Sequence, residues 1–289
     1  MRGASIKDPT KLRYPLLGSP KLDGIRAGQY YASGKGLLSR KLKRIPNRQV
    51  QRLFGGSALR AYDGELIAGD PTQPGCWNRT DSVVMSDEHE DWRTVRFYVF
   101  DHVGAADDPY TRRRARLKPR PGVIIVPQVL ISSPEELLRF HKGIVAKGYE
   151  GSMYRIPDGR YKYGRSTLRE QILLKHKDFE DCEARIVGFK EERENRNPQT
   201  RSRLGYAKRS SHKANKVGKG QVGAFIVKAI NGTFKGRTFP VGMGISDELG
   251  RRAFRYPKEY LRRVVTIRYR VEKGADKPWN CRLKGLRRD

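Results

Sequence analysis

The chain has 289 residues, enough for one large or two ordinary domains that each bury a core. Lys and Arg number 61 against 31 acidic residues, and the net charge of +30 favours nucleic acid over a membrane as partner, because no long apolar run or basic amphipathic helix is present. The three cysteines lie far apart without a CxxC pair, which argues against a disulfide framework and a zinc site.

The stretch PKLDGIR (20–26) carries the first chemical signal. The amine of Lys21 can attack a phosphate after losing its proton, and its unperturbed pKa is about 10.4, so we expect nearby cations and burial to favour the neutral form. Asp23 can take a hydroxyl or a metal, Gly24 allows a tight turn, and Arg26 can fork onto phosphate or ribose. By itself the stretch fits a charged surface turn equally well.

The first part of the chain mixes strands and helices, which is typical of an α+β fold. Residues 70–91 are polar and predict turns, with Trp77 and Met85 as anchors. Ser133 and Pro134 open a helix that should stop at Gly148. Helices are also predicted near 46–54 and from 110, and strands at 14–21, 25–32, 37–40, 59–68, 96–103, 122–130, 149–155 and 173–177.

Beyond residue 179 the pattern changes to strands, which predicts domains at 1–179 and 180–289. Strands at 184–189, 222–230, 237–244 and 264–271 fit a small all-β barrel such as an OB-fold. A long polar insert at 190–220 is either a disordered basic loop or an arm that orders on a phosphate backbone. The insert is rich in cations: Lys190, Arg193, Arg196, Arg201, Arg203, Lys208, Arg209, Lys213, Lys216 and Lys219.

Six short motifs follow one another in the first domain. They are KLDGIR (21–26), SR (39–40), DGE (63–65), VFDHV (99–103), EGSMYR (150–155) and LLKHK (173–177). Their order and spacing resemble motifs I, Ia, II, III, IV and V of ATP-dependent DNA ligases, which belong to the covalent nucleotidyltransferases. One such motif could arise by chance, whereas six in order could hardly do so.

From about residue 15 to the C-terminus, the chain resembles the minimal, chlorella-virus type of DNA ligase. The stretches EGSMYRIPDGRYKYGRSTLRE (150–170) and GYAKRSSHKANKV (205–217) carry it. The resemblance implies a nucleotidyltransferase (adenylation) domain of antiparallel sheets and helices, followed by an OB-fold domain. It also implies that the insert at 190–220 is a β-hairpin latch that closes on duplex DNA.

The resemblance implies roles for individual residues. Lys21 would carry AMP, Asp23 would assist sealing, and the like-facing Lys175 and Lys177 would contact the α-phosphate. Arg26 and Glu65 would hold the ribose and Phe100 the adenine, while Glu65 and Glu150 are hard oxygen donors suited to Mg²⁺. The residues expected to bind nucleic acid are Arg40, Arg165, Arg201, Arg203, Lys208, Arg209, Lys213 and Lys216.

Each of these residues also has a plainer interpretation. Phe100 alone fits a core residue, Lys175 and Lys177 a solvated strand face, and Glu65 a buried ion pair. Their linked positions in the motifs favour the site. His141 and His176 are expected at the surface.

The family's motif VI is only partly matched by KPWNCRLKGLRRD (277–289). Whether Arg282, Arg287 or Asp289 acts there is open.

The implied function is an ATP-dependent DNA ligase that seals 3′-OH/5′-phosphate nicks through lysyl-AMP and DNA-adenylate, in DNA repair or replication. The expected cofactors are ATP and Mg²⁺ or Mn²⁺, and the expected partner is nicked duplex DNA, bound by a monomer without a membrane. The alternatives are an RNA ligase or capping-type nucleotidyltransferase, and a catalytically decayed nucleic-acid-binding protein. No signal peptide is visible, so we expect a cytoplasmic protein, or one in the cytoplasm or nucleus of a host if it is viral.

Overall fold

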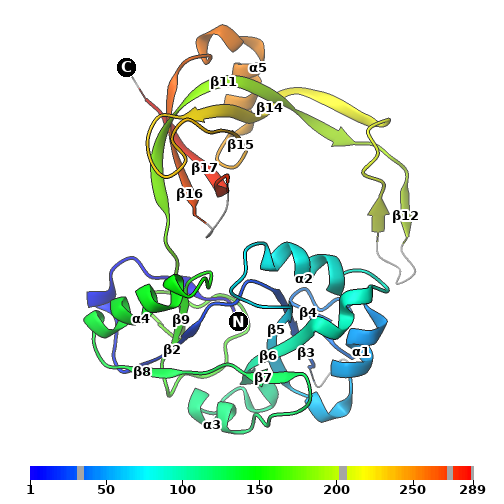
Figure 1. Cartoon of the computed structure of the whole chain (residues 1–289), viewed down its shortest axis with the longest axis vertical. Coiled ribbons are helices and arrows are strands. Elements are labelled where there is room, and N and C mark those ends of the chain that lie inside the picture. Colours follow the sequence, from blue (N-terminus) through cyan, green and yellow to red (C-terminus); the bar gives the residue numbers. More distant parts are fainter. Residues whose placement is uncertain (31–35, 202–206, 272–275, 288–289) are drawn as a thin grey trace. The chain divides into compact units, whose positions relative to one another are not determined.

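The chain divides into two units, Met1–Lys177 and Asp178–Asp289, each with its own core (Figure 1). This computed structural model describes residues 1–30, 36–201, 207–271 and 276–287. In those residues, no helix combines the length and apolar character that crossing a membrane requires.

The first unit is built on two five-stranded sheets that are antiparallel except where β1 joins β10 and β6 joins β7. One sheet has the order β1 (Ala4–Ser5), β10 (Leu173–His176), β9 (Ser152–Arg155), β2 (Leu16–Pro20) and β8 (Val129–Ile131). The other has the order β4 (Leu38–Ser39), β3 (Ile25–Gly28), β5 (Tyr62–Ala68), β6 (Val95–His102) and β7 (Val123–Ile125). The chain passes from the first sheet to the second between β2 and β3, and Lys21 lies in this connection.

Four α-helices pack on these sheets: α1 (Arg48–Phe54), α2 (Cys76–Val84), α3 (Tyr110–Ala115) and α4 (Pro134–Ala146). Asn47 caps α1 by accepting hydrogen bonds from the amides of Gln49 and Val50, and Ser133 caps α4. The predicted end of α4 is confirmed: Gly148 follows with φ +97, and a Cβ there would lie 2.5 Å from the carbonyl oxygen of Thr72.

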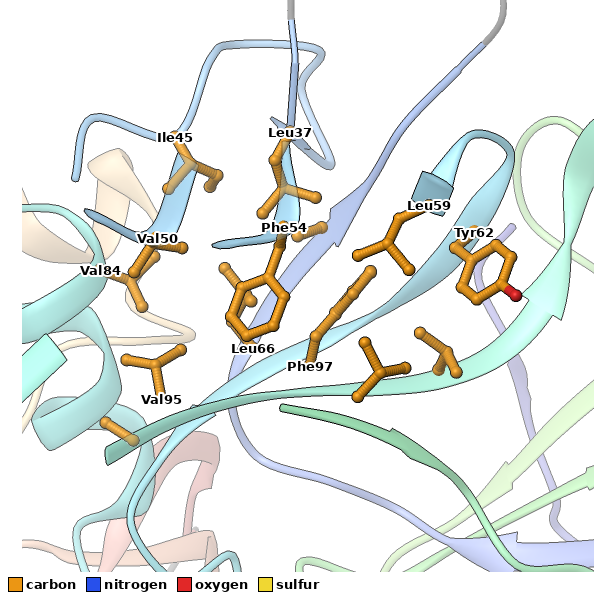
Figure 2. Packing of buried hydrophobic residues seen from close by; sticks show 14 of the residues in the cluster. Leu37, Ile45, Val50, Phe54, Leu59, Tyr62, Leu66, Val84, Val95 and Phe97 are labelled. Atoms are coloured by element: carbon orange, nitrogen blue, oxygen red, sulfur yellow. The ribbon is translucent and has the colours of Figure 1, made fainter. Parts of the chain in front are cut away.

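The core of the second sheet lies between its strands and α1 and α2. Figure 2 shows Phe54 of α1 beside Leu66 of β5 and Phe97 of β6. The rings of Phe54 and Phe97 are 5.8 Å apart and tilted by 50°, a favourable aromatic geometry.

Two predicted segments differ from the structure. Residues 76–84 form α2, whose buried residues Cys76, Thr80, Val83 and Val84 share one face; the polar Thr80 masks this periodicity. The expected anchors Trp77 and Met85 are 38% and 47% exposed.

The predicted strand 122–130 is instead two short strands, β7 and β8, in different sheets. Pro127 stands between them, where it cannot donate a ladder hydrogen bond.

The described residues of the second unit form a five-stranded antiparallel sheet, a short hairpin and one α-helix, α5 (Asp247–Arg255), which the strand pattern did not predict. The five-stranded sheet has the order β15 (Thr238–Val241), β14 (Lys216–Ala229), β11 (Glu180–Asn195), β16 (Val264–Arg270) and β17 (Trp279–Leu286). A bridge between Met243, just beyond β15, and Arg282 of β17 joins the two edges, with a 2.8 Å hydrogen bond from the Leu283 amide to the Met243 carbonyl. The sheet therefore closes as a small barrel.

The insert at 190–220 continues the barrel's own strands rather than forming a loop. β11 and β14 remain paired as far as Asn195 and Lys216, and a second hairpin, β12 (Gln199–Arg201) with β13 (Ala207–Arg209), follows (Figure 1). The side-chain amide Nδ2 of Asn197 donates to the backbone carbonyls of Ser210 and His212, which holds the base of this hairpin together.

A buried carboxylate ties the two sheets of the first unit together. Asp101 on β6 is fully buried and accepts hydrogen bonds from Arg113 on α3, at 2.8 and 3.2 Å, and from Arg155 on β9, at 2.6 Å. Because both guanidinium groups are also buried, they depend on this partner for compensation of their charge.

We predict that Asp101→Asn lowers the free energy of unfolding by about 3–5 kcal/mol, because it leaves two buried arginines without a counter-charge. The matched change Asp107→Asn, at an exposed position nearby, should cost less than about 0.5 kcal/mol. Urea unfolding followed by circular dichroism measures both, and equal midpoints for the two variants would refute the role of Asp101.

Candidate active site

A pocket of about 450 Å³ opens in the first unit where its two sheets meet. β3, β5 and β6 contribute one wall, and β2, β9 and β10 contribute the other. The lining residues include eight cationic side chains and one acidic one: Arg2, Lys21, Arg26, Arg40, Arg155, Arg165, Lys175, Lys177 and Glu65. Such a wall suits a ligand with several negative charges.

Lys21 is fixed by its backbone and by an ion pair. Its amide donates to the carbonyl of Gly151 at 2.8 Å, which places it beside Glu150. Its ammonium pairs with the Glu150 carboxylate, which also pairs with Lys177. A single buried carboxylate thus holds two of the pocket's lysines.

The ionisation of Lys21 differs from the expectation that neighbouring cations would favour the neutral amine. Burial alone would lower the pKa of Lys21, but the carboxylates of Glu150, Glu65 and Asp23 outweigh burial and raise it above its ordinary 10.5. Without ligands, Lys21 is therefore an ammonium ion. The sequence showed the cations but not which carboxylate touches the amine.

Lys175, unlike Lys21, has a lowered pKa. Burial is the main cause, and the charges of Arg165 and Lys21 add to it. Lys175 and Lys177 both line the pocket, from alternate positions at the end of β10.

The residue between these lysines, His176, stacks on His141 with ring centroids 3.9 Å apart. His141 is only 5% exposed and its Nδ1 lies 2.7 Å from the Ser152 hydroxyl, so the expectation that it lies at the surface was wrong. His141 lies on the buried face of α4, and the packing of this helix against the sheet could not be predicted from the histidine alone.

Arg26 is held by Asp63, the first residue of the DGE motif, for which no role was predicted. Asp63 is fully buried, and its carboxylate accepts hydrogen bonds from Nε of Arg26, at 2.6 Å, and from Nη2 of the same guanidinium. It also accepts a hydrogen bond from the Tyr161 hydroxyl at 2.8 Å. Burial alone would raise the pKa of Asp63, but Arg26 lowers it overall. Arg26 is thereby aimed over the Phe100 ring, 4.7 Å from its centroid.

Phe100 and Arg155 form the neighbouring part of the pocket. Both line it, and the Arg155 guanidinium lies 5.5 Å from the Phe100 ring centroid. Arg155 was not among the predicted site residues, although it is the last residue of the EGSMYR motif. A buried counter-charge, Asp101, is what sets its position, and the sequence cannot show that contact.

Glu65 and Gly24 approach each other across the β3–β5 pairing. The Gly24 amide donates to the Glu65 carboxylate at 3.1 Å, and burial raises the pKa of Glu65. A Cβ on Gly24 would lie 2.2 Å from the Leu66 carbonyl oxygen. Glycine is therefore required here because two backbone segments approach each other closely, and not because of the expected tight turn.

The remaining predicted residues of the first unit lie as follows. Arg40 and Arg165 are exposed and line the pocket. Asp23 is partly buried near Lys21, whose pKa it helps to raise.

Glu65 and Glu150 offer a divalent cation the oxygen donors that it prefers. Both are carboxylates, Glu65 lines the pocket, and Glu150 reaches two pocket lysines. Their donor chemistry fits Mg²⁺ or Mn²⁺.

The predicted nucleic-acid residues of the second unit lie along its β-ribbon. Arg201 ends β12, Lys208 and Arg209 lie on β13, and Lys213 and Lys216 follow. Four of them are exposed and Lys216 is half-buried. Arg203 lies outside the described residues.

The partly matched motif at the C-terminus is described only in part. Arg282 lies on β17, and Arg287 pairs with Glu183. Asp289 lies outside the described residues.

Comparison with known proteins gives the family. The model of the ATP dependent DNA ligase domain matches residues 11–177. The chain belongs to the ATP-dependent DNA ligases. The structure of a chlorella virus DNA ligase-adenylate is similar, with 25% identity and a TM-score of 0.54 over 99% of this chain and 98% of that one. A structure of a Lig E DNA ligase has 25% identity and a TM-score of 0.65 over 94% and 92%. No curated protein sequence matches significantly.

These findings confirm several predictions. The fold is α+β, a nucleotidyltransferase domain with an OB-fold domain, and the enzyme is a DNA ligase that uses ATP. The match extends over nearly the whole of both chains, so both units of the ligase belong to the comparison.

The contact between Lys21 and Glu150 leads to a pH-dependent prediction. Glu150→Gln removes the strongest of the charges that raise the pKa of Lys21, while burial still lowers it. The neutral, reactive amine should therefore appear at lower pH in the variant than in the wild-type ligase.

Reductive methylation of Lys21 across pH 7–11, quantified by peptide mass spectrometry without nucleotide or metal, measures this shift. Glu135→Gln, an exposed control on α4, should leave the midpoint unchanged. A common midpoint in all three proteins would show that Glu150 does not govern the charge of Lys21.

Proposed function

We propose that this ligase seals 3′-OH/5′-phosphate nicks in duplex DNA and that Lys21 carries AMP between ATP and the nick. The observation that carries the proposal is the composition of one pocket. It unites Lys21 with an aromatic face, Phe100, from one sheet and two lysines, Lys175 and Lys177, from the other.

The first step is formation of lysyl-AMP. The neutral amine of Lys21 forms a bond to the α-phosphorus of ATP, the bond from that phosphorus to the pyrophosphate oxygen breaks, and the proton of the amine goes to solvent. Lys175 and Lys177 stabilise the charge that gathers on the α-phosphate oxygens. The Phe100 ring stacks on adenine, while Arg26 and Glu65 hold the ribose and fix the line of attack.

The later steps take place at the break in the DNA. A 5′-phosphate oxygen attacks the phosphorus of lysyl-AMP, which releases Lys21 and gives DNA-adenylate. The 3′-hydroxyl then attacks the 5′-phosphate, forming the phosphodiester bond as AMP leaves, with Asp23 positioned to assist. Arg40 and Arg165 bind the 5′-phosphate, since a guanidinium matches phosphate geometry.

Glu65 and Glu150 would hold a divalent cation, which would neutralise phosphate charge and compete with Lys21 for the carboxylate of Glu150. Whatever draws Glu150 away from Lys21 would remove the strongest interaction that raises the pKa of this amine, and so would favour its neutral, nucleophilic form.

The ribbon of the second unit contacts the phosphate backbone away from the break. Its exposed cations, including Arg201, Lys208, Arg209 and Lys213, are set on a strand scaffold, so DNA meets charges already held in place. We propose that the ligase acts as a monomer, with residues 1–179 as the adenylation domain and 180–289 as the OB domain bearing this latch.

The covalent step gives the first prediction. With Mg²⁺, ATP should add one AMP to the protein, and peptide mapping should place it on Lys21; GTP should give no adduct. Lys21→Ala should abolish the adduct, whereas Lys11→Ala, at an exposed lysine, should not.

Intact mass spectrometry measures the adduct, and sealing of a labelled nick in a gel completes the test. A GMP adduct would favour a capping-type enzyme. Nick binding without adduct or sealed product would favour a decayed scaffold.

The ribbon gives the second prediction. Changing Arg201, Lys208, Arg209 and Lys213 together to Gln should weaken nick binding and flatten the log–log salt dependence by up to about 0.9 per lost phosphate contact. Lysyl-AMP formation should stay within about twofold of wild type, because these residues lie in the other unit.

The matched control removes the same charge elsewhere on the second unit, at Lys235, Arg251, Arg255 and Lys258, all exposed. Fluorescence anisotropy at several salt concentrations measures both variants. Equal slopes for the two would exclude the ribbon as the main DNA contact.

A further inference from the structure

We propose that the segment Met1–Ser5 is a working part of the nucleotide pocket and that the Arg2 side chain binds a phosphate group there. The segment precedes the residues matched by the ligase family, 11–177, and none of the six motifs includes it. The inference rests on the proposed function, since it assigns a phosphate contact within the same site.

The backbone of the segment joins the strand that carries two pocket lysines. β1 runs parallel to β10, with Ala4 opposite Leu174 and Ser5 opposite Lys175. The Ile6 amide donates to the Lys175 carbonyl at 3.0 Å. β1 is therefore the outer strand of the sheet that positions Lys175.

The same segment brackets Arg165, a residue proposed to bind the nick. The Arg2 amide donates to the Gly164 carbonyl at 2.6 Å, and the Ser166 amide donates to the Arg2 carbonyl at 2.8 Å. Together these bonds hold the two residues on either side of Arg165. A further bond, of 3.4 Å, runs from the Arg26 guanidinium to the Met1 carbonyl.

The Arg2 side chain is available for a ligand. It is exposed and lines the pocket together with Arg40, Arg165 and Lys175. Among the residues that the structure describes, it forms no ion pair. Gly3, the next residue, is buried against Met153, and a Cβ there would lie 3.2 Å from the Met153 methyl, so the segment is pressed onto the sheet with Arg2 at the pocket mouth.

Charge and geometry identify the ligand as a phosphate group. Eight cations line the pocket against one carboxylate, and a guanidinium on a backbone that is already fixed loses little freedom when it binds. Two phosphates reach this site in the reaction: the triphosphate of ATP and the 5′-phosphate of the nick. Both present the same chemistry to Arg2.

Lys7 provides a matched control because it is an exposed cation just beyond this segment that does not line the pocket. Arg2→Ala leaves the main-chain groups described above in place and removes the side chain beyond Cβ, guanidinium included. Arg2→Lys restores the charge but not the planar guanidinium with its paired N–H donors. Thermal unfolding of the exposed-site variants should match wild type, which separates binding from folding.

Two single-turnover measurements distinguish the two phosphates. One follows lysyl-AMP formation against ATP concentration, and the other follows AMP transfer from preformed lysyl-AMP to nicked DNA. We expect Arg2→Ala to slow at least one of them by about tenfold or more, as loss of a charged hydrogen bond does, with partial recovery in Arg2→Lys. Lys7→Ala should stay within about twofold in both.

If only lysyl-AMP formation slows, Arg2 binds a phosphate of ATP. If only AMP transfer to nicked DNA slows, Arg2 binds the 5′-phosphate of the nick. If both rates fall, Arg2 binds at a position that the two phosphates occupy in turn. If Arg2→Ala matches Lys7→Ala in both reactions while the wild-type ligase forms lysyl-AMP, this inference is wrong and the proposed function stands. A wild-type protein that forms no lysyl-AMP would overturn the proposed function itself, and the assignment of Arg2 with it.

Discussion

The carboxylate of Glu150 is the constraint on which the active site depends. It lies where the connection after β2 meets the segment before β9, and it pairs with both Lys21 and Lys177. In a site dominated by cations, this pairing holds two amines in place that would otherwise repel each other. The same contact helps to raise the pKa of Lys21, so in the unliganded enzyme the proposed nucleophile is held as an ammonium ion.

Other buried carboxylates of the first unit hold pocket arginines in place in the same way. Asp63 holds Arg26 over the Phe100 ring, and Asp101 holds Arg155 near the same ring. The pair of Arg26 and Asp63 joins two strands of one sheet, whereas the pair of Asp101 and Arg155 joins strands of two different sheets. Pairs of this kind contribute little net stability compared with apolar packing, but they fix orientation, which a catalyst that works by positioning requires.

The sequence was sufficient for the motifs, the order of domains and most strands, because alternating burial and capping residues act locally. The strand 264–271 shows this, since Val265, Ile267 and Tyr269 are all fully buried. Contacts between distant segments escaped prediction. The pairing of Lys21 with Glu150, the burial of His141 and the arrival of Arg2 at the pocket depend on which strands become neighbours, and nothing in the local sequence reports that.

We infer that Lys21 leaves Glu150 when it takes AMP, and a structure determined after incubation with ATP and Mg²⁺ would show whether it does. We predict a bond between Lys21 Nζ and the phosphorus of AMP, adenine stacked on Phe100, and Glu150 beyond hydrogen-bond reach of Nζ. Density for AMP on another residue, or Lys21 still paired with Glu150 beside intact ATP, would contradict it.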